Sequence, residues 1–340
     1  MSGLYKNGAI AAKLLAKKGR LLNDEQYGEL CSLDSVSAIA GYLSKTEGYS
    51  KFIKDYQEGI HRDKLEDLIY LSLLDDFESL YSFSKSSVRD FLLLYYLKRE
   101  IWIIKSAMYA VANKEESIHL SLPAHHQNID INAIENAKSI DELASNLKNT
   151  PYYKMISEGG SIFEIETKLD KYYFDKMFEA LYNADEDERA AAEELIGSEA
   201  DATNILWIYR AKKYYNMSPE RIKQTIINHF YRLKEEQVLI FAEADTAEDV
   251  VILTEKSHYR NILTDKVQET GNGLSTYLLF VNRKVLKKYP YCAVSTLAYI
   301  HIKRIEIQNI TTIIECVRYG LPPDVAYRHV IKGCDEIGDS

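Results

Sequence analysis

Residues that interrupt helices are scarce in this sequence, which has six prolines and 15 glycines among its 340 residues. Runs that alternate apolar and polar residues, the pattern of half-buried strands, are also scarce. A β-rich fold needs many turns, and turns draw on proline and glycine. The composition therefore argues against a β-rich fold and favours long helices.

Long apolar runs are missing as well, because no segment reaches 18 apolar residues without a charge. A helix needs about 20 apolar residues to cross a bilayer, so the sequence predicts no membrane span. The basic stretch from Lys6 to Arg20 has no apolar core and no small-residue cleavage site. We expect an amphipathic helix there rather than a targeting peptide.

Cysteine is rare and dispersed. The four cysteines are Cys31, Cys292, Cys316 and Cys334. Their spacing matches neither a zinc-binding motif nor a disulfide framework. With 46% apolar and 27% charged residues, the composition is that of a soluble globular protein. We expect free thiols in a reducing cytoplasm.

A surplus of basic residues is absent, since the net charge is −9. Nucleic-acid binding depends on a basic surface that releases counterions, so this balance argues against it. Part of the negative charge lies in one acidic run, from Asp185 to Glu199. We interpret this run as a solvated helix start, with a partner-facing acidic patch as the alternative.

Known catalytic motifs are missing too. The sequence has no phosphate-binding Gly-x-x-x-x-Gly-Lys-[Ser/Thr], no His-Glu-x-x-His and no Gly-x-Ser-x-Gly. His125 and His126 lie near Asp130, but adjacent side chains point apart and no fourth ligand is suitably spaced. Asp75 and Asp76 are adjacent rather than facing, which does not suggest an acid–base pair. We predict no catalytic residue, no cofactor and no metal.

The sequence does contain an internal repeat. Residues 305–320 have the same layout as residues 201–214, about 105 positions earlier. The matched pairs are Asp201 with Glu306, Asn204 with Asn309, Ile205 with Ile310 and Lys213 with Arg318. The exits agree as well, because Asn216 and Pro219 correspond to Gly320 and Pro323. Such a period leaves room for three copies, which we place at residues 1–118, 119–217 and 218–340.

Each third contains three helical segments in the same order. The first is a capped helix that ends near Tyr49, Tyr152 or Tyr259, the second a longer amphipathic helix, and the third the repeated segment itself. The predicted ranges are 35–53, 139–156 and 246–263 for the first, 65–80, 162–181 and 274–289 for the second, and 91–112, 201–214 and 305–320 for the third. The third segment diverges most in the first copy, where Lys98 and Ile101 are aligned with the acid and the asparagine.

Acidic and amide side chains of the third segment are candidates for a specific role. Asp201 and Glu306 lie in a predicted first turn, where a carboxylate complements the helix dipole. Asn204 and Asn309 lie three residues further on, on the same face. A mid-helix asparagine beside an apolar stripe needs a partner for its amide. We favour a structural role, fixing the register of one helix against another, over ligand binding. The helix-register candidates are Asp201, Asn204, Arg210, Glu306, Asn309 and Arg318.

The order and spacing of these segments resemble the C subunits of bacterial and archaeal V/A-type ATPases, a family related to the d subunit of the eukaryotic vacuolar ATPase. The resemblance covers nearly the whole chain. The residues that carry it are Asp201–Ile205 with Arg210, Glu306–Ile310 with Arg318, and the tyrosines Tyr49, Tyr152 and Tyr259.

The resemblance implies an all-α, funnel-shaped protein with three similar repeats in a pseudo-threefold arrangement. It implies a non-catalytic rotor adaptor that links the central-stalk rotor subunits to the membrane proteolipid ring. Such an adaptor transmits torque for ATP-coupled proton or sodium transport. It would be cytoplasmic, peripheral at the membrane through the ATPase complex, and would bind no nucleic acid.

Two other functions are compatible with a helical chain. One is a cytoplasmic helical-repeat scaffold protein of another assembly, although the period of about 105 residues exceeds the roughly 34–47 residues of common helical solenoids. The other is an all-helical enzyme that uses scattered carboxylates, which would require a deep pocket with converging acids.

Overall fold

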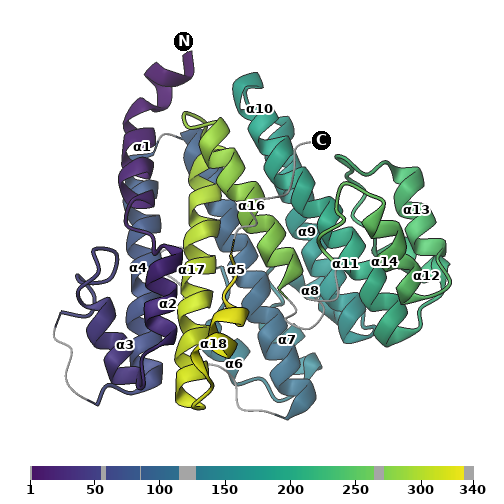
Figure 1. Cartoon of the computed structure of the whole chain (residues 1–340). Helices are drawn as coiled ribbons and strands as arrows, with labels where there is room; N and C mark the ends of the chain where they lie inside the picture. The colour runs from purple at the N-terminus through teal and green to yellow at the C-terminus, as the bar shows by residue number, and fades with distance from the viewer. Residues whose placement is uncertain (1, 55–58, 85, 115–127, 264–271, 333–340) are drawn as a thin grey trace.

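The computed structural model describes residues 2–54, 59–84, 86–114, 128–263 and 272–332 (Figure 1). Within these ranges the regular elements are all helices, and none of these residues forms a strand. The predicted all-α class is therefore confirmed. No helix of the described ranges is long and apolar enough to cross a membrane.

Long helices make up most of the molecule. They are α1 (Ser2–Lys18), α4 (Arg62–Phe83), α5 (Ser86–Asn113), α9 (Ile162–Tyr182), α11 (Ser198–Tyr215), α16 (Gly273–Lys288) and α17 (Val294–Arg318). The second predicted segment of each third corresponds to α4, α9 and α16, to within three residues at each end. The third corresponds to α5, α11 and α17, of which α17 begins 11 residues before the predicted start at 305.

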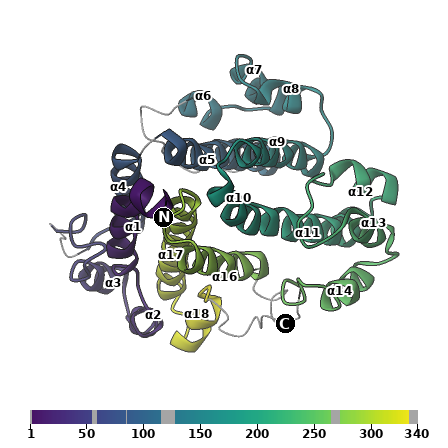
Figure 2. The ribbon, with the colours of Figure 1, turned by 90° about the horizontal axis from the view of Figure 1, so that it is seen from above.

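Short helices connect the long ones. They are α2 (Asp24–Cys31), α3 (Val36–Leu43), α6 (Ile131–Glu135), α7 (Ile140–Asn146), α8 (Tyr152–Ser157), α10 (Glu186–Ala192), α12 (Pro219–Thr225), α13 (Glu235–Glu243), α14 (Ala247–Glu255) and α18 (Pro323–His329). Seen from above, three groups of them lie outside the long helices: α2, α3 and α18; α6–α8; and α12–α14 (Figure 2).

Helix starts follow the sequence signals. Ser139 caps α7 by accepting a hydrogen bond from the Glu142 backbone N–H, 3.1 Å away. Thr246 forms a full capping box with Asp249 at the start of α14. These caps satisfy N–H groups that have no partner within the helix. The first predicted segments end earlier than expected, so that Tyr49 and Tyr259 lie in the turns that follow α3 and α14, and Tyr152 begins α8.

Helix ends of α5, α11 and α17 share one backbone feature. The residue just beyond each helix or its cap has a positive φ: 57° at Lys114, 44° at Asn216 and 65° at Gly320. A left-handed residue ends a helix by turning its last N–H groups back onto free carbonyls. The exits aligned from sequence, Asn216 and Gly320, are therefore equivalent in structure, and Lys114 is their counterpart in the first third.

A π-helical turn, η2 (Glu193–Gly197), joins α10 to α11. Such a turn accommodates one inserted residue in an α-helix. Asp201 lies 15 residues after the start of α10, whereas Glu100 lies 14 residues after the start of α5. Gly197, the last residue of this turn, packs against Tyr231. A Cβ at position 197 would lie 2.6 Å from Cβ of Tyr231, so a larger residue would clash there.

Two apolar cores hold the helices together. The larger one runs from Ile10 to Ile305 through the long helices and also includes Ile331. The smaller one combines residues 22–69 with residues 310–330, so segments near the two ends of the chain are packed on each other. Helix α17 contacts α2, α3, α4 and α18 there. This packing brings the C-terminal helices against the N-terminal third.

Candidate functional site

Three buried acid–tyrosine pairs recur in the molecule, one on each of α5, α11 and α17. The hydroxyl of Tyr152 donates to Glu100 Oε2 at 2.6 Å, and that of Tyr259 donates to Asp201 Oδ2 at 2.7 Å. The hydroxyl of Tyr49 donates to Glu306 Oε1 at 2.6 Å. In the first two pairs the partners are 52 and 58 residues apart, and in the third they are 257 apart. The third pair therefore joins the two halves of the chain.

Each acid also accepts hydrogen bonds from backbone N–H groups. These N–H groups lie just before the pair of short helices that leads to the tyrosine partner of that acid. Asp201 accepts from the N–H groups of Tyr231, Arg232 and Leu233 at 2.7–3.2 Å, just before α13. The corresponding N–H donors are Leu22 for Glu306, at 2.5 Å, and Asn128 for Glu100, at 3.2 Å. They precede α2 and α6. We call each such pair of short helices a connector. One carboxylate thus binds the backbone at the start of a connector and also the tyrosine that follows the connector.

The alignment of the first third needs a correction. Glu100, and not Lys98, occupies the position of Asp201 and Glu306, so this copy does contain the acid. The asparagine position falls on Ile103 rather than Ile101. A signal was available, because an isoleucine follows each acid by four residues, at Ile104, Ile205 and Ile310. The sequence alignment was two residues out of register.

The two asparagines bind backbone rather than another helix. Asn204 Nδ2 donates to the carbonyl of Ile227 at 3.0 Å, and the Ile227 N–H donates back to Asn204 Oδ1 at 2.8 Å. Asn309 forms the same pair of bonds with Ile331, at 2.9 and 2.7 Å. Ile227 and Ile331 lie just after α12 and α18. Each amide therefore holds the chain that returns from a short helix against the long helix.

The two arginine candidates do not join these clusters. Arg210 and Arg318 are both exposed. Arg318 lies near the end of α17, with Nη1 3.4 Å from Glu315 Oε1 and its guanidinium 5.2 Å from the ring centre of Tyr319. Burial raises the pKa of Tyr109 on α5, and the positive charge of Arg210 opposes this rise, which places Arg210 near that helix.

The electrostatic setting differs among the pairs. Burial raises the pKa of Asp201 and of Glu100, and the hydrogen bonds that each accepts oppose this rise. Glu306 instead has a cation beside it, because Lys303 Nζ lies 2.7 Å from Glu306 Oε1 and both side chains are 3% exposed. Burial raises the pKa of Tyr49, Tyr152 and Tyr259, so their hydroxyls keep their protons and remain donors.

These clusters hold the protein together and show no arrangement for chemistry. Among the described residues, no three His, Cys, Asp or Glu side chains could hold a metal ion. His125 and His126 lie outside the described residues, and Asp130 caps α6. Asp75 and Asp76 are each paired with a lysine, Lys51 and Lys17.

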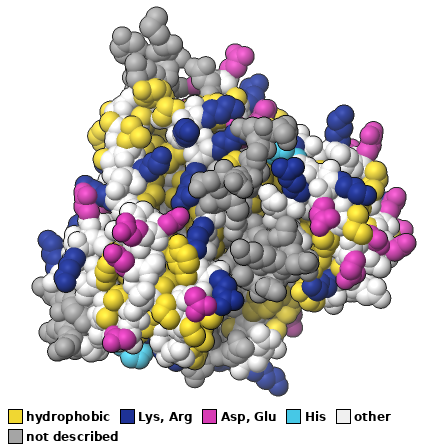
Figure 3. Space-filling view, viewed as in Figure 1, with side chains coloured by type: hydrophobic (Ala, Val, Ile, Leu, Met, Phe, Trp, Pro, Cys, Tyr) yellow, Lys and Arg dark blue, Asp and Glu magenta, His cyan; other side chains and the backbone are white. Residues whose placement is uncertain are grey.

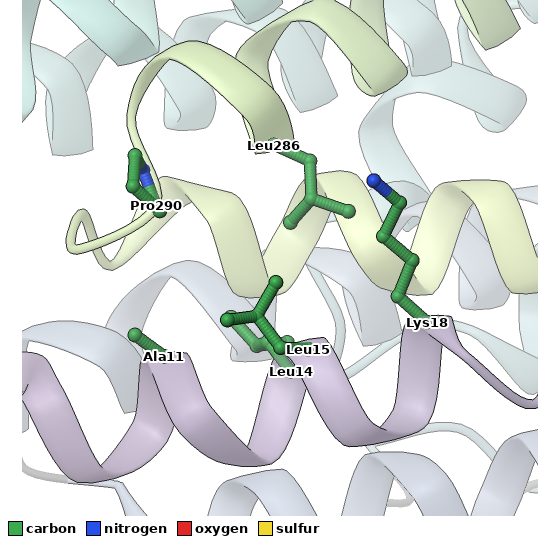
Figure 4. A pocket seen from close by; sticks show the side chains of 6 residues that line it. All are labelled: Ala11, Leu14, Leu15, Lys18, Leu286 and Pro290. Atoms are coloured by element: carbon green, nitrogen blue, oxygen red, sulfur yellow. The ribbon is translucent and has the colours of Figure 1, made fainter.

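Two hollows in the described part of the molecule are small. One, of about 60 Å³, is lined by charged residues that include Lys17, Asp76 and Lys303. Figure 4 shows the other, an apolar hollow of about 10 Å³ where Leu14 and Leu15 of α1 face Leu286 and Pro290. A ligand pocket usually offers about 300–1,000 Å³. Neither hollow is a candidate active site.

Charged side chains are mixed over the face shown in Figure 3. Basic and acidic side chains lie interspersed there, with hydrophobic side chains between them. A nucleic-acid interface would gather lysine and arginine into a continuous patch. The face in this view has no such patch.

Comparison with known proteins gives one family. The model of the family described as ATP synthase (C/AC39) subunit matches residues 10–328. The C subunit of the A-type ATP synthase of Methanosphaera stadtmanae is 24% identical, over 96% of this chain and 87% of the relative. The C subunits of the A-type ATP synthases of Methanothermobacter thermautotrophicus and Archaeoglobus fulgidus are 24% and 23% identical, and cover 96% and 95% of this chain.

Proposed function

Because this chain belongs to the family of C/AC39 subunits of ATP synthases, we propose that it is the rotor adaptor of a V/A-type ATPase. In this role it links the central stalk to the membrane proteolipid ring and transmits torque for ATP-coupled proton or sodium transport. The C/AC39 subunit is a structural subunit and is not itself catalytic. The protein is held at the membrane periphery through its partners. The observation that carries the proposal is the family match, which extends over residues 10–328.

A ring of three latched repeats is part of the proposal. With repeats at 1–118, 119–217 and 218–340, Glu100 of the first binds Tyr152 of the second, and Asp201 of the second binds Tyr259 of the third. Glu306 of the third binds Tyr49 of the first. Each repeat thus supplies the acid for the tyrosine of the next, and the last closes onto the first. This cyclic pattern supports a pseudo-threefold funnel.

A closed arrangement of three repeats suits the transfer of torque. Twisting the central stalk against the proteolipid ring would shear the contacts between neighbouring repeats of the adaptor. Close-packed interiors transmit strain rather than absorbing it, and the acid–tyrosine pairs add directional bonds at each junction. A rotor adaptor has to be rigid in this sense.

The polar candidates serve the same rigidity. Asp201, Asn204, Glu306 and Asn309 fix connectors onto α11 and α17, which refines the expected helix-to-helix register into helix-to-connector register. Arg318 lies in the last turn of α17, where a cation complements the helix dipole. Arg210 lies before the last turn of α11, whose basic residues are Lys212 and Lys213, so this role does not extend to it.

A binding experiment tests the proposal. Purified full-length protein, immobilised through a tag, is mixed in turn with the central-stalk subunits and with the detergent-solubilised proteolipid ring of the same ATPase. We expect both to be retained. Failure to retain either one would contradict an adaptor that bridges the two.

A further inference from the structure

Three equivalent positions near the middle of the molecule carry different charges. They lie two residues before each acid and are Lys98, Glu199 and Arg304, on α5, α11 and α17. Seen from above, α5, α10 and α17 border the same central region, and α11 continues from α10 (Figure 2). Ring contacts agree, because Tyr95 of α5 lies 6.4 Å from His301 of α17, centroid to centroid.

Only two of the three charges pair with each other. Lys98 forms an ion pair with Glu199, whose side chain is 6% exposed. Arg304 is half-buried, and its Nε has no hydrogen-bond partner among the described residues. A guanidinium can only donate hydrogen bonds and stays charged at any ordinary pH. Within the described part of the chain, the third member of the set is therefore a cation without a partner.

Other buried polar atoms without a partner lie near Arg304, whose charge acts with burial to lower the pKa of His301 and opposes the rise that burial causes in the pKa of Tyr173. The hydroxyl of Tyr173 and Nε2 of His301 are buried without a hydrogen-bond partner in the described ranges, and these residues are 3% and 4% exposed. The hydroxyl of Tyr70 and Nε of Arg99 are in the same state. Buried polar atoms nearly always have partners, so a cluster of unpaired donors needs an acceptor. A negatively charged oxygen satisfies both the donors and the charge.

One side of this cluster is closed and the other open. The residues five before each acid, Tyr95, Ile196 and His301, are all buried. Two residues after the acids, Trp102 is 42% exposed and Gln308 is exposed, whereas Thr203 is buried, so the cluster is open only beside α5 and α17. An acceptor can therefore reach Arg304 from the side of Trp102 and Gln308.

We propose that Arg304, with Tyr173 and His301, binds a carboxylate side chain presented by a protein partner that enters the central region. This inference rests on the proposed function, in which that partner is the end of the central stalk. Charge complementarity argues for the occupant, since among the three equivalent positions Lys98 and Glu199 neutralise each other and leave Arg304 as the unpaired charge.

The charge pattern also selects an orientation. A pseudo-threefold socket accepts a partner in three rotational positions that differ little in shape. With Lys98 neutralised by Glu199, Arg304 is the one of the three equivalent positions, among the described residues, that offers an unpaired cation to an acidic side chain of the partner. One of the three positions is favoured, which gives the adaptor a defined angle to the stalk.

The test measures the affinity of the full-length protein for the stalk subunits of the same ATPase, by biolayer interferometry at low and at raised salt. We expect Arg304→Gln to weaken binding about 30-fold or more, the effect of truncating one partner of a buried hydrogen-bonded charge pair. Arg304→Lys keeps the charge and should recover most of the affinity. Arg318→Gln, an exposed arginine of the same helix, is the matched control and should bind like the wild type. Thermal unfolding of each variant separates loss of folding from loss of the contact.

Each outcome decides between the claims. A wild-type protein that does not bind the stalk overturns the proposed function and this inference with it. Arg304→Gln that binds as tightly as the wild type overturns the inference alone. Inorganic phosphate that raises the melting temperature of the wild type but not of Arg304→Gln, with stalk affinity unchanged, assigns the cluster to a free oxyanion and also overturns it.

The orientation claim has its own test. Glu199→Gln frees Lys98, so a second cation becomes available at an equivalent position. A photo-crosslinking amino acid in place of Gln308 should mark one set of stalk residues in the otherwise wild-type protein and a second set in addition in Glu199→Gln. Identical crosslinks in both would show that this charge pattern does not set the angle.

Discussion

The Asp201 and Glu306 clusters hold equivalent places in the molecule but balance their charge differently. Asp201 is held by three consecutive backbone N–H groups and the hydroxyl of Tyr259. Glu306 has one backbone donor, the hydroxyl of Tyr49 and the ammonium of Lys303. In the Glu306 cluster, the ammonium of Lys303 balances the charge that the backbone amides balance at Asp201.

Chain separation is the second difference between these clusters. The Asp201 pair spans 58 residues and the Glu306 pair 257. Loop-closure entropy grows by about 0.6 kcal/mol for each doubling of length, so the longer closure costs roughly 1 kcal/mol more. The stronger, ionic cluster lies where the chain has more entropy to overcome.

The largest expected effect comes from breaking the ionic cluster. Glu306→Gln leaves the ammonium of Lys303 buried without a counter-charge, and we expect a loss of about 3–5 kcal/mol in unfolding free energy. The double variant Lys303→Met with Glu306→Gln should recover part of it. Urea unfolding followed by circular dichroism measures both. Glu255→Gln, on an exposed residue of α14, is the control. If the double variant is no more stable than the single one, the stranded charge is not the cause.

The next largest loss of stability is expected from removing an asparagine clamp, the pair of hydrogen bonds that Asn309 or Asn204 makes with one backbone residue. Asn309→Leu leaves the N–H and carbonyl of Ile331 unpaired, at a cost of about 2–4 kcal/mol. Asn204→Leu should cost a similar amount, because it makes the same two bonds to Ile227. Gln308→Leu, one residue away and exposed, should change stability little. Equal melting temperatures for the Asn309 and Gln308 variants would contradict the clamp.

Removing a tyrosine hydroxyl should cost less unfolding free energy, and the cost should differ between the Glu306 and Asp201 clusters. Tyr49 contacts both Glu306 and Lys303, the latter at 3.0 Å, so Tyr49→Phe should lose about 2–3 kcal/mol. Tyr259→Phe loses its bond to Asp201 and should cost about 1–2 kcal/mol. Tyr319→Phe, at an exposed site, is the reference. A reversed order for the two buried tyrosines would show that Lys303 does not strengthen its cluster.

The smallest effect is a dependence on pH that Asp201 contributes. Burial raises its folded-state pKa above the ordinary 3.8. A raised pKa means that the folded state binds the proton more tightly than the unfolded state does. The stability contributed by this group is therefore complete below pH 3.8 and is lost as the pH rises through the folded pKa. The wild type should lose stability relative to Asp201→Asn over that window. A difference that stays constant or rises with pH would contradict the assignment.

Prediction from sequence succeeded where signals were local. The amphipathic stripes located α4, α9 and α16. The repeated segment of the first third was predicted to end at residue 112, one residue before the end of α5. The acid within that segment was nevertheless aligned with Lys98, two residues before Glu100, so Glu100 was missed.

The partners of the candidate residues could not be predicted. Asp201 meets Tyr259, and Glu306 meets Tyr49, through tertiary packing over 58 and 257 residues. No local pattern encodes such a distance. The sequence identified most of the polar residues that matter and the three tyrosines, but the structure was needed to join them.

The central claim is that this chain sits between the stalk and the ring and turns with them. A cryo-electron-microscopy reconstruction of the intact ATPase that contains this chain tests it most directly. We expect the chain to lie on the rotor axis, in contact with the stalk on one side and the proteolipid ring on the other. Density for the chain at the outside of the complex, away from the axis, would contradict the account.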